Sequence, residues 1–335
     1  MKKSIKILIP ILIIIVGFTA GIFLYRKTGI KDMVEKNRAE ENDRDIIATF
    51  GNRTLTIQEA KVYLTSVKNQ TELIYGREVW DYKAEGTDKN YKELMKSNML
   101  EKIKYIKVVC EHAGEYDVTL STEDMADVSA YVSDFFAGIS ESTANEYKLN
   151  TELLTKIYSE NILANKVYSK ITLNHDSGAN ETNCRQGDFL CMSFKKYKTD
   201  EDNNPVYLDE NDLAELKKNA ESAYNAAKNG DFRAVATAYC AGEEIELTAG
   251  KDELPAEIAD SVMMLSVGET SSLLESRDAY YVFKCVNYKN EDATKTAVQK
   301  KINQEREDYF RSIYEGWYKK TDISIDTEKW DSVSY

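Results

Sequence analysis

The chain has 335 residues, of which 42% are hydrophobic and 30% are charged, and its formal net charge is −13. This composition is that of a globular protein rather than a disordered one, and the length predicts more than one folding unit. The acidic charge argues against a nucleic-acid partner, because binding to phosphates needs a concentrated basic surface and only short lysine pairs occur.

An uncharged and mostly aliphatic run covers residues 7–25, between two groups of basic residues. Insertion of this run into a bilayer is favoured by about 4–8 kcal/mol before Pro10 and the glycines are counted. We therefore expect an uncleaved single-pass anchor in the cell membrane over residues 1–27, with most of the chain on the extracytoplasmic side. The alternative is a signal peptide cleaved near Thr19-Ala-Gly21. Residues 28–44 are predicted to be a polar spacer.

A helical unit is predicted over residues 45–172. It opens with a strand, Ile46–Phe50, a turn and the pattern Thr56-Ile-Gln-Glu59, which is typical of a capping box at the start of a helix. Further helices with apolar stripes are predicted at 91–113, at 122–136 after Ser121 and at 151–171 after Asn150.

A polar linker over residues 173–184 leads into a second unit. Leu254, Ile258, Val262 and Leu265 recur at helical spacing, and Gly268 ends that pattern. Two runs rich in strand-forming residues follow, 271–274 and 279–286. Because the second run has apolar residues at both odd and even positions, we expect a strand that is covered on both faces.

Several segments between residues 185 and 288 occur in the order and spacing of the parvulin family of peptidyl-prolyl isomerases. The segments are Arg185–Cys191, Asn229-Gly-Asp-Phe232, Ser266-Val-Gly-Glu269 and Ala279–Lys284, and together they resemble that family. The strand, turn and helix at 46–59 resemble the start of the SurA/PrsA group of extracytoplasmic foldases, which carry a parvulin domain. The resemblance implies an α+β fold in which a parvulin-like domain of antiparallel sheet plus helices, residues 185–288, is inserted into a discontinuous helical unit.

The C-terminal region fits this organisation. A long helix is predicted over 293–320, and a lone helix cannot bury its apolar stripe, so it must pack on another part of the chain. In the foldases resembled here, the equivalent helix returns to the N-terminal helices. We therefore predict that residues 291–328 complete the helical unit, and that Ile323–Ile325 pairs with Ile46–Thr49.

The resemblance also implies where a catalytic site would lie. Active parvulins have one histidine in the first strand and another in the last, and the matching positions here are Asp188 and Tyr281. Cys240 lies near the family's Asp or Cys position. Because both histidines are absent, it stays open whether the chain is an enzyme, and we expect Asp188 and Tyr281 to hydrogen-bond to each other instead.

Two apolar residues, Leu254 and Ile258, match positions that line the proline pocket of that family, with ordinary helix-to-sheet packing as the alternative. The five cysteines have no metal-ligand spacing, and an odd number excludes a complete disulfide framework. No phosphate-binding glycine loop is present, so we expect no cofactor and no metal.

The sequence favours a membrane-anchored chaperone or foldase that binds unfolded or proline-containing secreted polypeptides, with a parvulin-like module of weak or no activity. One alternative is an active peptidyl-prolyl cis-trans isomerase with substituted site residues, since amide rotation breaks no covalent bond. Another is a tethered scaffold protein of the cell envelope.

Overall fold

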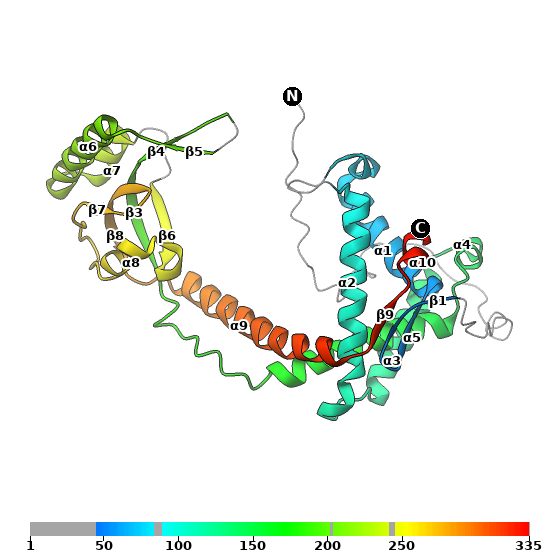
Figure 1. Cartoon of the computed structure of the whole chain (residues 1–335). Helices are drawn as coiled ribbons and strands as arrows, with labels where there is room; N and C mark the ends of the chain where they lie inside the picture. The colour runs from blue at the N-terminus through cyan, green and yellow to red at the C-terminus, as the bar shows by residue number, and fades with distance from the viewer. Residues whose placement is uncertain (1–44, 84–88, 202–203, 241–244, 335) are drawn as a thin grey trace. The chain divides into compact units, whose positions relative to one another are not determined.

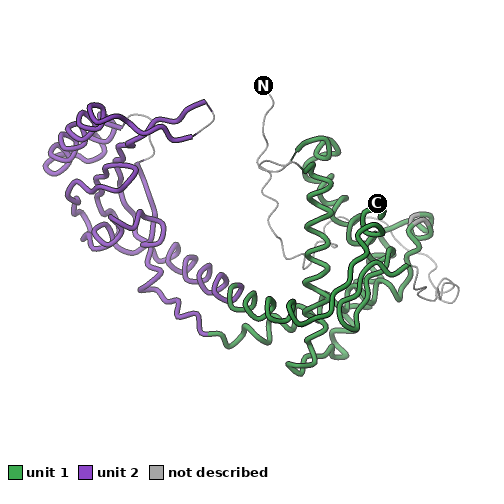
Figure 2. The backbone as a smooth tube through the Cα atoms, viewed as in Figure 1, with its two compact units in different colours: residues 1–175, 308–335 green, residues 176–307 purple. Residues whose placement is uncertain are grey.

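The structure is a computed structural model that describes residues 45–83, 89–201, 204–240 and 245–334. The chain forms two compact units: Met1–His175 with Asp308–Tyr335 is unit 1, and Asp176–Glu307 is unit 2 (Figure 2). The predicted membrane anchor and the spacer after it lie outside the described residues. No helix within the described ranges is both long and apolar enough to span a membrane.

Unit 1 begins with a small sheet whose strands come from both ends of the chain. Strand β1 (Ile46–Phe50) turns at Gly51, which has a φ of +59°, into β2 (Arg53–Thr56). Strand β9 (Ile323–Ile325) lies antiparallel on the other side of β1, with Ala48 opposite Ile325 and Phe50 opposite Ile323. The strand order is therefore β2-β1-β9, and the predicted pairing of the two chain ends is confirmed.

Helices make up the rest of unit 1 (Figure 1). Side chains that accept a backbone N–H start several of them: Asn90 and Ser121 form capping boxes, and Asn150 bonds to the Leu153 N–H. The elements are α1 (Ile57–Tyr75), η2 (Arg77–Asp81), α2 (Tyr91–Glu111), η3 (Ala113–Tyr116), α3 (Thr122–Ala137), α4 (Glu141–Glu146), α5 (Thr151–Thr172) and α10 (Thr327–Ser332).

The longest element, α9 (Glu291–Lys320), begins in unit 2 and ends in unit 1. Its last part supplies Phe310 and Trp317 to the core of unit 1, which also contains Phe50 of β1, Ile103 of α2 and Leu154 of α5. Trp317 lies parallel to the His112 ring, with 5.0 Å between the ring centroids, and Phe310 meets Tyr168 edge to face. The apolar stripe of α9 is thus buried against helices from the N-terminal part of the chain.

Unit 2 is an antiparallel sheet of order β6-β3-β8-β7 with helices on both faces. One face packs on α6 (Glu210–Asn229) and α7 (Phe232–Tyr239) through Leu190, Met192 and Val282. The other packs on α8 (Ala256–Met263) through Phe189 and Phe283. The strands are β3 (Gln186–Lys195), β6 (Glu246–Gly250), β7 (Leu274–Glu275) and β8 (Ala279–Asn287), with η4 (Lys251–Glu253) after β6.

Two features of unit 2 differ from the sequence prediction. Only Leu274 of the run 271–274 lies in a strand, the two-residue β7. Ser271 accepts the Phe283 N–H with its hydroxyl and donates its own N–H to the Phe283 carbonyl. A separate hairpin, β4 (Tyr197–Thr199) and β5 (Pro205–Tyr207), was not predicted. The prediction that 279–286 is covered on both faces is confirmed for Ala279–Cys285, whereas Val286 is exposed.

Candidate functional site

Asp188, at the position of the first parvulin histidine, lies on β3 and accepts hydrogen bonds from three neighbouring side chains. The donors are Thr248 Oγ1 on β6 at 2.7 Å, Asn290 Nδ2 before α9 at 3.0 Å, and Asn287 Nδ2 on β8 at 3.1 Å. Partial burial raises the pKa of Asp188, but these hydrogen bonds outweigh it and hold the pKa below its ordinary value. Asp188 is therefore a charged acceptor that joins two strands and the start of α9.

The predicted hydrogen bond between Asp188 and Tyr281 is wrong. On β8, Asn287 is opposite Asp188, whereas Tyr281 is opposite Ser193. Five positions along a strand separate the two pairs, which is about 17 Å. Tyr281 stacks on Phe283, with 5.9 Å between the ring centroids, and burial raises the pKa of its phenol.

The third matching position, Cys240, lies on the opposite face of the sheet from Tyr281. Cys240 ends α7 in the core that contains Met192, and its Sγ is 3.9 Å from the Ser193 carbonyl oxygen. Tyr281 packs against the core on the α8 face. The structure does not bring Asp188, Cys240 and Tyr281 together, and both histidines of the chain, His112 and His175, lie in unit 1.

The two residues matched to the proline pocket belong to the core between α8 and the sheet. Ile258 is 1% exposed and Leu254 is 8% exposed, and both pack with Phe189, Ala249 and Phe283. This arrangement is the helix-to-sheet packing that the sequence left open as the alternative. All five cysteines are free, and burial raises the pKa of the Cys191 thiol to about 12, so this thiol stays protonated and a poor nucleophile.

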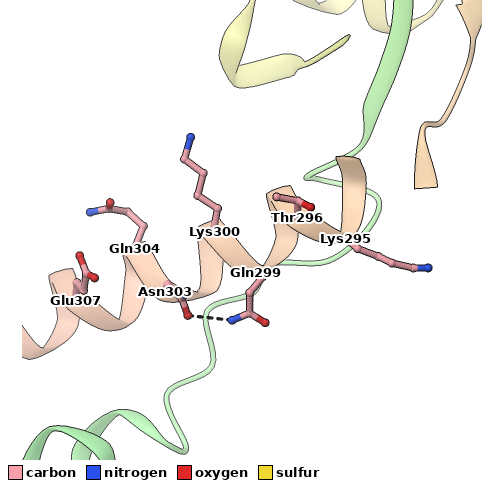
Figure 3. Close-up of a pocket in the computed structure, with 7 residues that line it drawn as sticks. All are labelled: Lys295, Thr296, Gln299, Lys300, Asn303, Gln304 and Glu307. Atoms are coloured by element: carbon pink, nitrogen blue, oxygen red, sulfur yellow. Dashed lines mark hydrogen bonds between the residues drawn. The ribbon is translucent and has the colours of Figure 1, made fainter. Parts of the chain in front are cut away.

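One depression in unit 2 is open to solvent and is lined by polar and charged residues of a single helix. It has a volume of about 620 Å³ and is lined by Lys295, Thr296, Gln299, Lys300, Asn303, Gln304 and Glu307 of α9 (Figure 3). Within it, Gln299 Nε2 donates to Asn303 Oδ1 at 2.9 Å. Small-molecule sites are concave and bury most of the ligand, so this open helix surface does not have the character of such a site.

Large apolar side chains are exposed at the C-terminal end of α1. Leu73 is 81% exposed, Ile74 70% and Tyr75 44%, and Tyr82, which follows η2, is 49% exposed. We call these four residues the apolar tip. The neighbouring η2 is held to α1 because Trp80 Nε1 donates to Glu72 Oε1 at 2.9 Å. Consecutive exposed apolar residues on a well-packed unit are typical of a surface that binds other polypeptides.

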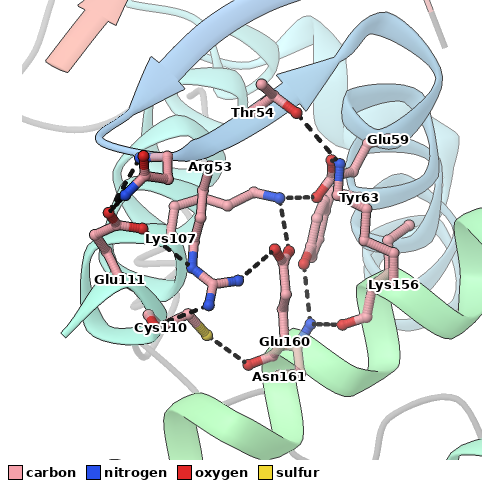
Figure 4. A network of polar contacts seen from close by, with 12 residues as sticks. Arg53, Thr54, Glu59, Tyr63, Lys107, Cys110, Glu111, Lys156, Glu160 and Asn161 are labelled. Atoms are coloured by element: carbon pink, nitrogen blue, oxygen red, sulfur yellow. Dashed lines mark hydrogen bonds and ion pairs between the residues drawn. The ribbon is translucent and has the colours of Figure 1, made fainter. Parts of the chain in front are cut away.

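Charged side chains that we did not predict from the sequence are buried inside unit 1 (Figure 4). Lys107 of α2 has no exposed surface, and its Nζ lies 2.5 Å from Glu59 Oε1 and 2.6 Å from Glu160 Oε2. Arg53 adds a contact of 3.1 Å to Glu160 Oε1 and donates to the Cys110 carbonyl. These ion pairs join β2, α1, α2 and α5.

This network corrects the capping-box prediction for Glu59. Thr56 does accept the Glu59 N–H, at 3.2 Å, but the Glu59 carboxylate turns into the core instead of returning to the Thr56 backbone. Burial raises the pKa of Glu59, with Glu160 adding to the rise and Lys107 opposing it. A usable signal was present in the sequence, since Lys107 shares a helical face with Ile103 and Cys110.

Comparison with known proteins adds structural likenesses. No protein-family model and no curated protein matches the chain. Among solved structures, the foldase PrsA from Lactococcus lactis is 14% identical, covers 86% of this chain and 97% of its own, and has a TM-score of 0.35. The peptidylprolyl isomerase PrsA from Bacillus cereus has the same identity and TM-score, with coverages of 88% and 100%.

A third match comes from work on two SurA-like chaperones, PEB4 and Cj1289, of Campylobacter jejuni. It is 9% identical, covers 84% of this chain and 98% of the matched chain, and has a TM-score of 0.31.

Proposed function

We propose that this protein is an extracytoplasmic chaperone that binds unfolded secreted polypeptides. Residues 7–25 would hold it at the cell membrane, and the module at 185–288 would have weak or no peptidyl-prolyl isomerase activity. The observation that carries the proposal is the apolar tip, where Leu73 and Ile74 are exposed by 81% and 70%. Unfolded chains differ from folded ones chiefly in their exposed apolar side chains, which such a surface binds.

The geometry of unit 2 supports a binding role over catalysis. Rotation about a prolyl amide takes the nitrogen lone pair out of conjugation with the carbonyl group, so a hydrogen-bond donor near the prolyl nitrogen lowers the barrier. Asp188 instead offers a carboxylate, which accepts hydrogen bonds. It already accepts them from Thr248, Asn287 and Asn290. Leu254 and Ile258, which would have to contact the proline, are buried among Phe189 and Phe283.

The test is suppression of aggregation by the full chain, kept in mild detergent because residues 7–25 are predicted to span a membrane. Several unrelated proteins are reduced and unfolded, and their light scattering is followed with and without the chain. We expect suppression for all of them and a clear loss in the variant Leu73→Ser/Ile74→Ser. The matched control is Leu173→Ser, because Leu173 is also exposed, by 69%, but follows α5 away from the apolar tip.

Three results would contradict the proposal. Suppression restricted to a single partner would favour the scaffold protein. Rapid isomerisation of a proline peptide that depends on Asp188 or Tyr281 would favour the enzyme. Equal losses in the tip variant and in Leu173→Ser would remove the role of the tip.

A further inference from the structure

Strand β6 forms an outer edge of the sheet in unit 2, and part of it is open to solvent. Its neighbour on one side is β3, and no strand lies on its other side within the described residues. Glu246, Leu247 and Thr248 are exposed, whereas Ala249 and Gly250 are buried. The open part of the edge is therefore the stretch Glu246–Thr248.

The hydrogen bonds to β3 show which backbone groups of β6 point outward. Cys191 N–H donates to the Ile245 carbonyl at 2.7 Å, so these two residues face each other as a bonded pair. Bonded and non-bonded pairs alternate along an antiparallel ladder, so Leu247 and Ala249 also face β3. The N–H and C=O groups of Glu246 and Thr248 consequently point away from the sheet.

The end of this edge is closed by a side chain, which limits its length. Gly250 is the next residue of β6 whose N–H points away from β3, and this N–H donates to Glu253 Oε2 at 2.6 Å. Among the described residues, no hydrogen bond reaches the outward backbone groups of Glu246 and Thr248. Two residues thus present both a donor and an acceptor to solvent, spaced as the next strand of a sheet requires.

Contacts of the side chains hold this edge in an extended form. Glu246 Oε1 lies 2.6 Å from Arg233 Nη1 of α7, and Thr248 Oγ1 donates to Asp188 on β3. Leu247, between them, is 37% exposed. The edge is thus ordered by its own unit, so a chain that pairs with it does not have to order it.

We propose that the Glu246–Thr248 edge accepts an extended segment of an unfolded polypeptide as an added strand of the sheet. The inference rests on the proposed chaperone function and names the form in which the client is bound. Alternating backbone donors and acceptors are matched by another extended backbone whatever its sequence, and Leu247 favours an apolar residue beside it. A second copy of this chain is a poorer occupant, because two chains of net charge −13 repel each other.

The experiment compares Glu246→Pro with Glu246→Ala in the full chain in detergent. Both variants lose the carboxylate, but only proline removes the outward N–H, and proline is tolerated where an edge N–H faces solvent. The probe is the synthetic peptide Lys-Lys-Thr-Val-Thr-Val-Thr-Val-Lys-Lys, with an analogue N-methylated at every Thr and Val. Loss of one hydrogen bond should weaken binding in Glu246→Pro about 2- to 10-fold relative to Glu246→Ala.

Hydrogen exchange of the wild-type chain, read by NMR, gives a second measurement that needs no variant. The peptide should slow exchange at the Thr248 amide, whereas the Leu247 amide, already bonded to β3, should change little, and the N-methylated analogue should have neither effect. This readout decides the matter if Glu246→Pro fails to fold.

The outcomes separate the two proposals. Peptide binding that is equal in both variants and leaves Thr248 exchange unchanged would overturn the edge proposal while the chaperone function stands. Protection of Thr248 without peptide in a sedimenting dimer would identify a second copy as the occupant and also overturn it. A wild-type chain that suppresses no aggregation would instead contradict the chaperone function.

Discussion

Replacement of Lys107 by methionine should strongly destabilise unit 1. Methionine keeps most of the side-chain volume but leaves the fully buried Glu59 with only Lys156, whose Nζ is 3.5 Å away and partly exposed. Glu160 keeps Arg53 at 3.1 Å. Removal of one partner from a buried ion pair costs about 3–5 kcal/mol, because an uncompensated charge remains in the core.

The fluorescence of tryptophan measures this loss in unit 1 alone, since Trp80, Trp317 and Trp330, the three tryptophans of the chain, all lie there. For a unit of this size, Lys107→Met should lower the melting temperature by roughly 6–20 °C. The matched control is Lys166→Met, which breaks a partly exposed pair with Asp124 and should cost no more than about 1 kcal/mol.

A double variant, Lys107→Met/Glu59→Met, tests the mechanism. With the Glu59 carboxylate also removed, no unpaired charge stays buried, so the double variant should be more stable than Lys107→Met alone. A double variant at least as unstable as the sum of the two single changes would refute the reasoning. So would a loss below about 1 kcal/mol in Lys107→Met, since desolvation of the stranded carboxylate would then be small.

The same variant has a pH dependence of known sign. Burial raises the pKa of Glu59 in the folded state above its ordinary value of 4.5. At pH values between the ordinary pKa and the raised pKa of the folded state, the folded state binds more protons than the unfolded state. The free energy of unfolding therefore falls as the pH rises through that window. Loss of Lys107 removes a cation that lowers this pKa, which extends the window upward. Lys107→Met should therefore recover part of its lost stability as the pH is lowered from 7 toward 5.

Three further outcomes are expected. Ile258→Ala should destabilise unit 2 by about 2–5 kcal/mol in denaturant unfolding. Below the melting temperature of the variant, client binding should stay intact. Loss of binding without loss of stability would show that Ile258 contacts the ligand. Asp188→Ala and Tyr281→Phe should leave the rate at which the chain isomerises a proline peptide unchanged in a protease-coupled assay. The pKa of Asp124 is lowered to about 2 by hydrogen bonds from Lys166 and Ser121, so its stabilising contribution disappears as the pH falls from its ordinary 3.8 toward 2. The stability of Asp124→Asn should therefore fall less steeply than that of the wild type as the pH is lowered through this range. Tryptophan fluorescence measures this unfolding.

Local signals in the sequence predicted the helix starts of unit 1 well. Ser121 and Asn150 cap α3 and α5 as expected, because a capping bond involves residues only three positions apart. The pairing of β9 with β1 was predicted from the resemblance to the SurA/PrsA group, and the structure contains it.

The relative positions of distant residues could not be predicted in the same way. The ladder between β3 and β8 has an irregularity between Asp188 and Phe189, and a shift in register moves every facing pair. Resemblance placed Asp188 and Tyr281 on neighbouring strands, which is correct, but could not fix which residues are opposite. β6 was not predicted, because the extended form of Glu246–Gly250 depends on pairing with the distant strand β3.

The strand β9 has a consequence for the time order of folding. Its partner β1 is near the start of the described chain, so all the residues between β1 and β9 must be made before Ile323–Ile325 can complete the sheet. Unit 2 is continuous in sequence and has all its strands available earlier. A chain emerging N-terminus first would therefore leave the apolar residues Ile47 and Phe50 without their last neighbour until β9 has been made. Loss of β9 and the residues after it, through a nonsense codon or a protease, would then damage unit 1 more than unit 2.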